Sequence, residues 1–351
     1  MTTLLEARHL TKVYGGGPFH RANAVVALDD LSLAIEDAPP TITAVVGESG
    51  SGKTTFNQLL LGLSAPTSGE VLYRGVDLRR LDRDQRKHFL RDVQAIFQDP
   101  DEVYNPFYKI DHVLEEPVAN FGLASSKAKA RALIEQALVS VGLRPEETLG
   151  RFPHQLSGGQ RQRVMVARAL IVNPRLIIAD EPVSMVDASL RATIIDTLRD
   201  LNRRLGISII YVSHDLTTAY QLSENIVVLY RGGVAEAGDI EQVVKQPEHP
   251  YTRLLIGAVP LPDPKLPWGQ VESVAEWTEG APAVSKGCRF TDRCAFKMPM
   301  CHESRPPLYQ TAPHRITACY LYRESPVTTS TRLEQNFAAR AEIGAMTAAG
   351  Q

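Results

Sequence analysis

The stretch GESGSGKT, residues 47–54, constrains the fold of this chain more than any other part of the sequence. It fits the pattern G-x-x-x-x-G-K-[ST], in which glycines allow backbone N–H groups to turn toward phosphate oxygens. The β-rich run TITAVV precedes it at 41–46, and a helical run over 53–61 follows it. A strand, a glycine loop and a helix in this order place phosphate at the positive end of the helix. The sequence therefore predicts a buried strand that leads into a triphosphate-binding loop.

Lys53 and Thr54 end this loop with the two side chains that a bound triphosphate requires. The ammonium of Lys53 can neutralise β- and γ-phosphate oxygens, and the hydroxyl of Thr54 can ligate Mg²⁺. A glycine-rich loop can also be merely flexible, but the strand before it and the helix after it favour phosphate binding. We expect triphosphate contacts from Gly47, Ser49, Gly50, Gly52, Lys53, Thr54 and Thr55.

Two adjacent carboxylates end another apolar run, LIIADE at 176–181. Asp180 would hold Mg²⁺, directly or through water. Glu181 points to the other side of the pleat and would orient or deprotonate an attacking water. Alone, such a pair is most simply a solvated strand end, but together with a phosphate loop it indicates hydrolysis.

Two further polar residues follow β-rich runs, Gln98 after DVQAIF and His214 after SIIYVS. A polar residue at a strand end is usually a surface residue. In α/β sheets, however, ligands bind at the carboxyl ends of the strands. We therefore expect Gln98 to touch Mg²⁺ and water, and His214 to contact the γ-phosphate and position Glu181.

The order of apolar patterns predicts an α/β fold. Strands alternate with helices, which is typical of a parallel sheet covered on both faces. Residues 4–13 and 25–35 predict antiparallel strands, and 110–150 predict a helical insertion without strands. Further strands are expected at 70–73, 93–97, 175–179, 207–212 and 225–230, and helices at 83–90, 159–172 and 189–204.

A second phosphate-gripping element, LSGGQRQR, lies at 156–163. Ser157 is a candidate N-cap, and the two glycines after it expose N–H groups at the positive end of a helix. If this element gripped the same nucleotide as Lys53, the two would be redundant. The alternative is that it grips a nucleotide held by another chain, so that two chains pair head-to-tail.

Charge and hydropathy limit the partners. The 351 residues carry a formal net charge of −2, which gives no global attraction to nucleic acid. The N-terminus lacks a secretory pattern, and no apolar run approaches the roughly 20 residues that span a bilayer. We expect a cytoplasmic protein that reaches a membrane only through a partner.

The motifs GESGSGKT, Gln98, LSGGQ, ADEP, Asp187 and SHD occur in the order found in the ATPase subunits of ATP-binding-cassette (ABC) transporters, which residues 4–245 resemble. The resemblance implies a P-loop NTPase (RecA-like) core with an antiparallel β subdomain and an inserted helical subdomain. It also implies that Tyr14 stacks on adenine. Contacts to the ATP of a partner subunit are implied for Ser157, Gly158, Gly159, Gln160 and Asp187.

The motifs QDP with Asn105-Pro106 and HPYTRLL at 249–255 are similar to those of oligopeptide/dipeptide importer ATPases. This implies a second ATPase subunit, a paralogue more readily than an identical chain. It also implies two permease subunits, an indirect periplasmic solute-binding protein and a place at the cytoplasmic face of the plasma membrane. Alternatives are oligosaccharide import, an accessory ATPase of a carbon–phosphorus lyase complex, and a soluble ABC protein of translation or DNA repair.

All four cysteines lie close together in the sequence, in the pattern C-x5-C-x6-C-x17-C: Cys288, Cys294, Cys301 and Cys319. A cytosolic location disfavours disulfides, and no C-x2-4-C pair typical of structural zinc occurs. Four thiolates also suit a [4Fe–4S] cluster, which the resemblance to importer ATPases implies at these cysteines. Zinc and unliganded thiols remain the alternatives.

Prolines crowd the chain after about residue 246 and indicate a boundary. The expected organisation is an ABC ATPase domain at 1–246, with its helical subdomain at about 99–160. A small cysteine-containing module follows at 247–325, and residues 326–351 are expected to form a loosely attached tail.

Overall fold

The computed structural model describes residues 3–15, 24–99, 103–184, 186–259, 286–328 and 332–337. Backbone contacts divide the chain into two compact units. The first unit joins Met1–Leu78 to Val212–Gln351, and the second is Arg79–Tyr211. In the described part of the chain, no helix is long and apolar enough to cross a membrane.

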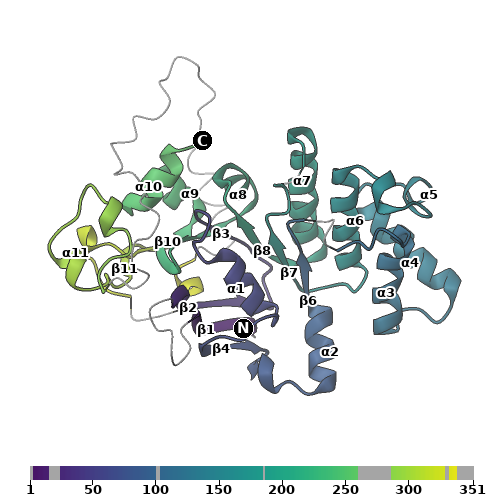
Figure 1. Ribbon diagram of the computed structural model, residues 1–351, viewed down its shortest axis with the longest axis horizontal. Coiled ribbons are helices and arrows are strands. Elements are labelled where there is room, and N and C mark those ends of the chain that lie inside the picture. The colour runs from purple at the N-terminus through teal and green to yellow at the C-terminus, as the bar shows by residue number, and fades with distance from the viewer. Residues whose placement is uncertain are drawn as a thin grey trace, which may run out of the picture. The chain divides into compact units, whose positions relative to one another are not determined.

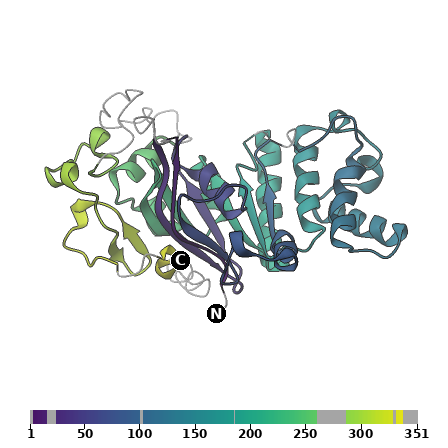
Figure 2. The ribbon, with the colours of Figure 1, turned by 60° about the horizontal axis from the view of Figure 1, so that its bottom comes forward.

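The first unit contains the predicted antiparallel sheet, with strands in the order β2-β1-β4-β5. Its strands are β1 (Thr3–Tyr14), β2 (Val25–Glu36), β4 (Ser68–Tyr73) and β5 (Val76–Asp77). The long strands β1 and β2 run side by side (Figure 2). Runs of consecutive buried residues, including Leu4, Leu5, Leu31 and Leu33, place much of both strands in the core. The turn between β1 and β2 lies outside the described residues.

The strand before the phosphate loop is fully buried, as the sequence predicts. All five residues of β3 (Ile42–Val46) are buried, which is typical of a strand covered on both faces. It pairs in parallel with β9 (Asn225–Tyr230), and Val46 lies opposite Val228. The helix α1 (Lys53–Leu60) follows the loop (Figure 1).

The C-terminal residues extend this sheet. In the first unit the strand order continues from β9 through β10 (Gly233–Asp239) and β12 (Arg315–Thr317) to β11 (Tyr309–Ala312). Ala237 of β10 pairs with Ile316 of β12. The compositional boundary at 246 therefore does not separate two compact units, because backbone hydrogen bonds cross it.

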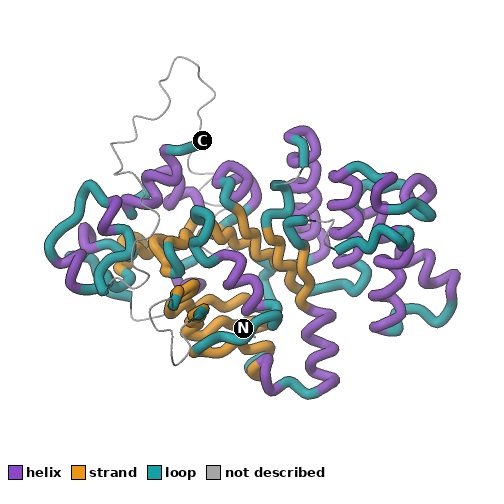
Figure 3. Tube along the Cα trace, in the orientation of Figure 1, coloured by secondary structure: helices purple, strands orange, loops and turns teal. Residues whose placement is uncertain are grey.

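The second unit contains two parallel strands and most of the helices. Residues 110–150 contain helices and no strand among the described residues, as predicted (Figure 3). The strands are β6 (Val93–Ile96) and β7 (Leu176–Asp180). The helices are α2 (Arg83–Asp92), α3 (Ile110–Phe121), α4 (Lys127–Ser140), α5 (Pro145–Thr148), α6 (Gly158–Leu170) and α7 (Ala188–Leu205). The strand β8 (Ser208–Ser213) lies across the division between the units.

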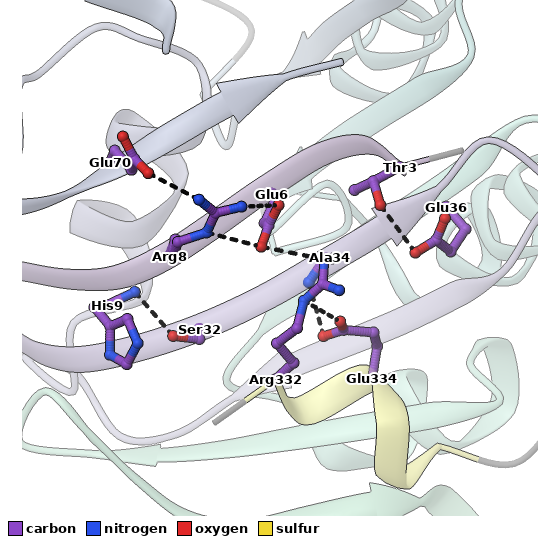
Figure 4. A network of polar contacts seen from close by, with 10 residues as sticks. All are labelled: Thr3, Glu6, Arg8, His9, Ser32, Ala34, Glu36, Glu70, Arg332 and Glu334. Carbon is purple, nitrogen blue, oxygen red and sulfur yellow. Dashed lines mark hydrogen bonds and ion pairs between the residues drawn. The ribbon is translucent and has the colours of Figure 1, made fainter. Parts of the chain in front are cut away.

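Residues 332–337 are held more firmly than expected. A short 3-10 helix, η7 (Leu333–Asn336), packs on β2, and Leu333 is fully buried. The carboxylate of Glu334 accepts a hydrogen bond from the backbone N–H of Ala34 at 2.9 Å. Arg332 pairs with the buried Glu6 of β1 at 3.1 Å (Figure 4). A loosely attached tail is thus the wrong description for residues 332–337.

Candidate functional site

The phosphate loop is built so that only glycine fits at two of its positions. Gly47 has φ +154°, and a Cβ there would lie 2.2 Å from the carbonyl oxygen of Leu229. Gly52 has φ +106°, and its Cβ would lie 2.4 Å from the carbonyl oxygen of Ala27. The backbones of β2 and β9 therefore lie directly against the loop. Any side chain at Gly47 or Gly52 would have to displace them.

Backbone hydrogen bonds fix the loop in its shape. The N–H of Ser51 donates to the oxygen of Glu48 at 3.1 Å, and the N–H of Gly232 donates to the oxygen of Ser51 at 2.8 Å. The buried ammonium of Lys53 donates to the oxygens of Gly47 and Glu48, at 2.6 and 3.0 Å. The loop thus curls around a positive charge, which is the environment that a triphosphate needs.

The remaining loop positions are open to a ligand. Ser49, Gly50 and Thr54 are exposed, and Thr55 is half-buried. Within the described residues, no side chain caps the start of α1. Its first N–H groups can therefore serve a bound anion.

We expect Gly47→Ala to lose ATP binding, because the new Cβ would meet the carbonyl of Leu229. The measurement is the rise in melting temperature on adding MgATP, which should disappear. Gly75→Ala, between β4 and β5 and outside the loop, is the matched control: it has φ +83° but nothing lies within 4 Å of its Cβ. The left-handed backbone costs it about 1–2 kcal/mol, while ATP binding should persist. Equal ATP binding by the two variants would contradict this account.

Tyr14 and His214 also belong to the first unit. Tyr14 ends β1 opposite Val25, two residues before the Ala27 carbonyl that touches the loop. The residue is 41% exposed, which leaves it available for stacking. His214 is exposed directly after β8. Its backbone is fixed because the N–H of Asp215 donates to Ser213 Oγ at 2.9 Å.

Gln98 and the two carboxylates lie at one edge of the second unit's parallel strands. β6 and β7 are in register, with Ile96 opposite Ala179. Asp180 is the last residue of β7, and Gln98 comes two residues after the end of β6, so both lie at the carboxyl ends of neighbouring strands, as the sequence predicts. Glu181 has φ +45°, a left-handed conformation that is costly for a residue with a side chain.

The second phosphate-gripping element has the predicted helix cap. Ser157 precedes α6, and its Oγ accepts a hydrogen bond from Gln160 N–H at 3.2 Å. The side-chain oxygen of Gln160 accepts in return from Ser157 N–H at 2.9 Å. A Cβ on Gly159 would lie 2.4 Å from Leu190 of α7, the helix that begins directly after the exposed Asp187. Ser157, Gly158 and Asp187 thus belong to two adjacent helix starts.

The four cysteine side chains line one small apolar hollow in the first unit. Backbone N–H groups approach three of the sulfurs, each from the residue two positions later: Phe290 for Cys288, Phe296 for Cys294 and Leu321 for Cys319. Met298 N–H donates to the sulfur of Cys301 at 3.5 Å. Burial raises the pKa of Cys288 and Cys294, and raises that of Cys319 to about 12. Among the described residues, no group of three or more Cys, His, Asp or Glu side chains is arranged to hold a metal ion.

Sequence reasoning missed the residues that brace the loop from the C-terminal region. Arg293 and Tyr251 both contact Glu48, the second residue of the loop. Tyr251 lies in the HPYTRLL motif, which was a weak signal. Arg293 has no local signal, because its partner is 245 positions away in the chain.

The chain matches known protein families and individual proteins over most of its length. A family model described as "ABC transporter" matches residues 28–184, and one described as "Oligopeptide/dipeptide transporter, C-terminal region" matches 235–301. The putative oligopeptide transport ATP-binding protein YkfD of Bacillus subtilis is 36% identical, over 92% of this chain and 96% of its own length. The dipeptide transport ATP-binding protein DppF of Haemophilus influenzae is 37% identical, over 91% and 97%.

The fold has similar solved structures. One is the dimeric ATP-binding cassette MJ0796 in a post-hydrolysis state bound to ADP and Pi. It has a TM-score of 0.59 and 30% identity, and the match covers 67% of this chain and 98% of that one.

Proposed function

Since this chain belongs to the ATP-binding subunits of ABC transporters, in their oligopeptide/dipeptide group, we propose that it hydrolyses ATP to energise the import of peptides. The observation that carries the proposal is the phosphate loop, whose backbone and lysine are held in a ligand-ready shape in a chain that also has the peptide-transporter C-terminal region. Relatives over nearly the whole chain are named as oligopeptide and dipeptide transport proteins, which supports peptides as the cargo.

Each predicted site residue has a role in the proposed hydrolysis. The loop amides and Lys53 hold the triphosphate, while Thr54, Asp180 and Gln98 hold Mg²⁺. Tyr14 stacks on the adenine. Glu181 activates the in-line water, and His214 contacts the γ-phosphate. Most of the barrier is lowered by positioning and by charge stabilisation, as in other phosphoryl transfers.

The proposed working state is a pair of ATPase subunits. Ser157, with its helix-start N–H groups, has no role at the nucleotide of its own chain and completes the γ-phosphate shell of the partner. The dimeric arrangement of the structural neighbour supports this. We infer that the partner is a paralogue, that both bind two permease subunits at the cytoplasmic face of the membrane, and that nucleic acid has no part.

Reconstitution of the complete membrane complex tests the proposal. ATPase activity should rise when the solute-binding protein is loaded with a peptide. Stimulation by an oligosaccharide-loaded protein instead would assign a different cargo to the same machinery. Absence of any membrane partner in a pull-down, together with phosphonate enzymes in its place, would contradict the import function.

For the cysteine hollow we propose a [4Fe–4S] cluster held by Cys288, Cys294, Cys301 and Cys319. Convergence of four thiols on one hollow and the approach of N–H groups to the sulfurs support it. The cysteine spacing contains no C-x2-4-C pair of the kind typical of structural zinc sites. The cluster would hold together a region that has little core of its own.

Anaerobically purified protein should therefore be brown and contain about four iron and four sulfide per chain. Cys301→Ser should lower both and lower the melting temperature, because Cys301 is buried in the hollow. Met300→Leu is the control, since it alters the adjacent residue without removing a thiol. A colourless, zinc-loaded protein would contradict the proposal, and so would four thiols that all react without release of metal.

A further inference from the structure

Glu48, the second residue of the phosphate loop, is contacted from the C-terminal region. Its carboxylate accepts two hydrogen bonds from the guanidinium of Arg293, at 2.8 and 3.1 Å. Its backbone N–H donates to the hydroxyl of Tyr251 at 2.8 Å. Both the side chain and the peptide group of Glu48 are thus held by residues more than two hundred positions later in the chain.

Arg293 is a fixed rather than a mobile partner. Only 14% of its side chain is exposed, and its guanidinium lies over the rings of Tyr230 and Phe290, at 5.8 and 5.6 Å from their centres. The hydrogen bonds to Glu48 raise the pKa of Arg293 further above its ordinary value. A two-pronged ion pair held on aromatic rings is more rigid than an ordinary surface pair.

Tyr251 is equally fixed. It is fully buried and packs against the ring of Tyr230 at 4.4 Å and that of Phe290 at 5.6 Å. Tyr230 and Phe290 therefore support both residues that hold Glu48. Phe290 lies between Cys288 and Arg293, in the turn that also contributes to the cysteine hollow.

The backbone carbonyl oxygen of Glu48 connects this residue to two others of the loop. Glu48 O accepts hydrogen bonds from Lys53 Nζ at 3.0 Å and from Ser51 N–H at 3.1 Å. The N–H that Tyr251 holds shares its peptide group with Gly47 O, which accepts from Lys53 Nζ at 2.6 Å, so a rotation of this group would remove that oxygen from the lysine. Arg293 donates hydrogen bonds to Glu48 and, at 3.5 Å, to the hydroxyl of Tyr230, and Glu48 is the one of these two that belongs to the loop.

We infer that Arg293 and Tyr251 are positioning residues for ATP, and that they couple the cysteine hollow to the nucleotide loop. Arg293 directly precedes Cys294, so whatever occupies the hollow fixes the turn that holds Glu48. By linkage, nucleotide binding must stabilise the hollow as much as the hollow stabilises nucleotide binding. The inference rests on the proposed ATP site. That site is tested separately, by measuring whether the wild-type chain binds a fluorescent ATP analogue.

Arg293→Gln should weaken binding of that analogue to the full-length chain by roughly 5- to 50-fold, within the usual range of site coupling. KM should rise while kcat changes less than about twofold, since ground-state positioning is what is lost. The affinity of Arg293→Lys for the analogue should lie between those of the wild type and Arg293→Gln, because lysine keeps the positive charge but cannot donate two parallel hydrogen bonds. Arg74→Gln is the control, an arginine of the same unit that likewise pairs with a carboxylate, Asp37 at 3.1 Å, and lies over an aromatic ring, Tyr73 at 5.6 Å.

A double-mutant cycle distinguishes coupling from general damage. Glu48→Gln alone should reproduce the defect, and the double variant with Arg293→Gln should be no worse than either single one. Glu48 is 37% exposed, so this variant tests the pair even if Arg293→Gln does not fold. Additive effects, or a fall in kcat with KM unchanged, would overturn the inference.

The reciprocal effect is measured without turnover. MgATP should slow the reaction of the four cysteines with a thiol reagent, or the loss of bound iron, in the wild-type chain. The protection should be absent in Arg293→Gln and retained in Arg74→Gln. Equal protection in all three proteins would show that the loop and the hollow are independent.

Discussion

Glu181→Gln is expected to lower kcat by about 10²- to 10⁴-fold, the usual contribution of a positioned general base. Glutamine has the same size and keeps the backbone of Glu181 in its left-handed conformation, φ +45°. It cannot take a proton from the attacking water. The affinity for MgATP should stay near the wild-type value, because the triphosphate is held by the loop and Lys53. Single-turnover measurements with radiolabelled ATP separate binding from hydrolysis.

The control for this variant is Glu135→Gln, which removes a carboxylate of the second unit that pairs with Arg131 on the surface of α4. It should hydrolyse ATP at the wild-type rate. Near-normal turnover by Glu181→Gln would remove Glu181 from the proposed role. Loss of nucleotide binding would instead assign the carboxylate to Mg²⁺.

Ser157→Asp is expected to lower kcat of the assembled ATPase pair by about 10²- to 10³-fold, as loss of a transition-state donor does. Aspartate is as good an N-cap as serine, so α6 should remain intact and the melting temperature unchanged. Its negative charge would, however, repel the γ-phosphate of the partner's ATP. The same variant should bind ATP normally as a separate chain, because its own loop is untouched.

Ser157→Ala separates the two roles of this serine. It removes the hydrogen bond from Gln160 N–H, and the lost cap should cost roughly 0.5–2 kcal/mol of stability. Stability is measured by denaturant unfolding and turnover by phosphate release. If Ser157→Asp weakened ATP binding by the separate chain, the second phosphate-gripping element would contact the nucleotide of its own chain. Unchanged turnover in the assembled pair would exclude contact with any γ-phosphate.

The sequence predicted best those parts of the site whose geometry depends on residues close together in the chain. The loop at Gly47–Thr54 and the cap at Ser157 each depend on residues within a few positions, so their spacing carries the geometry. The buried strands β3 and β7 follow from apolar runs in the same way. The edge that joins Gln98 to Asp180 needed one more step, the rule that parallel strands end together.

The sequence therefore determined the chemistry of this protein, because phosphate-binding and helix-capping geometry is set by neighbouring residues. Only the tertiary structure decided which distant residues support it. The pairing of β12 with β10 and the packing of η7 on β2 join segments with no matching local pattern. The ion pair between Arg293 and Glu48 joins residues that are 245 positions apart in the chain. Such contacts depend on the closure of the whole chain around its core, and no local pattern records that closure.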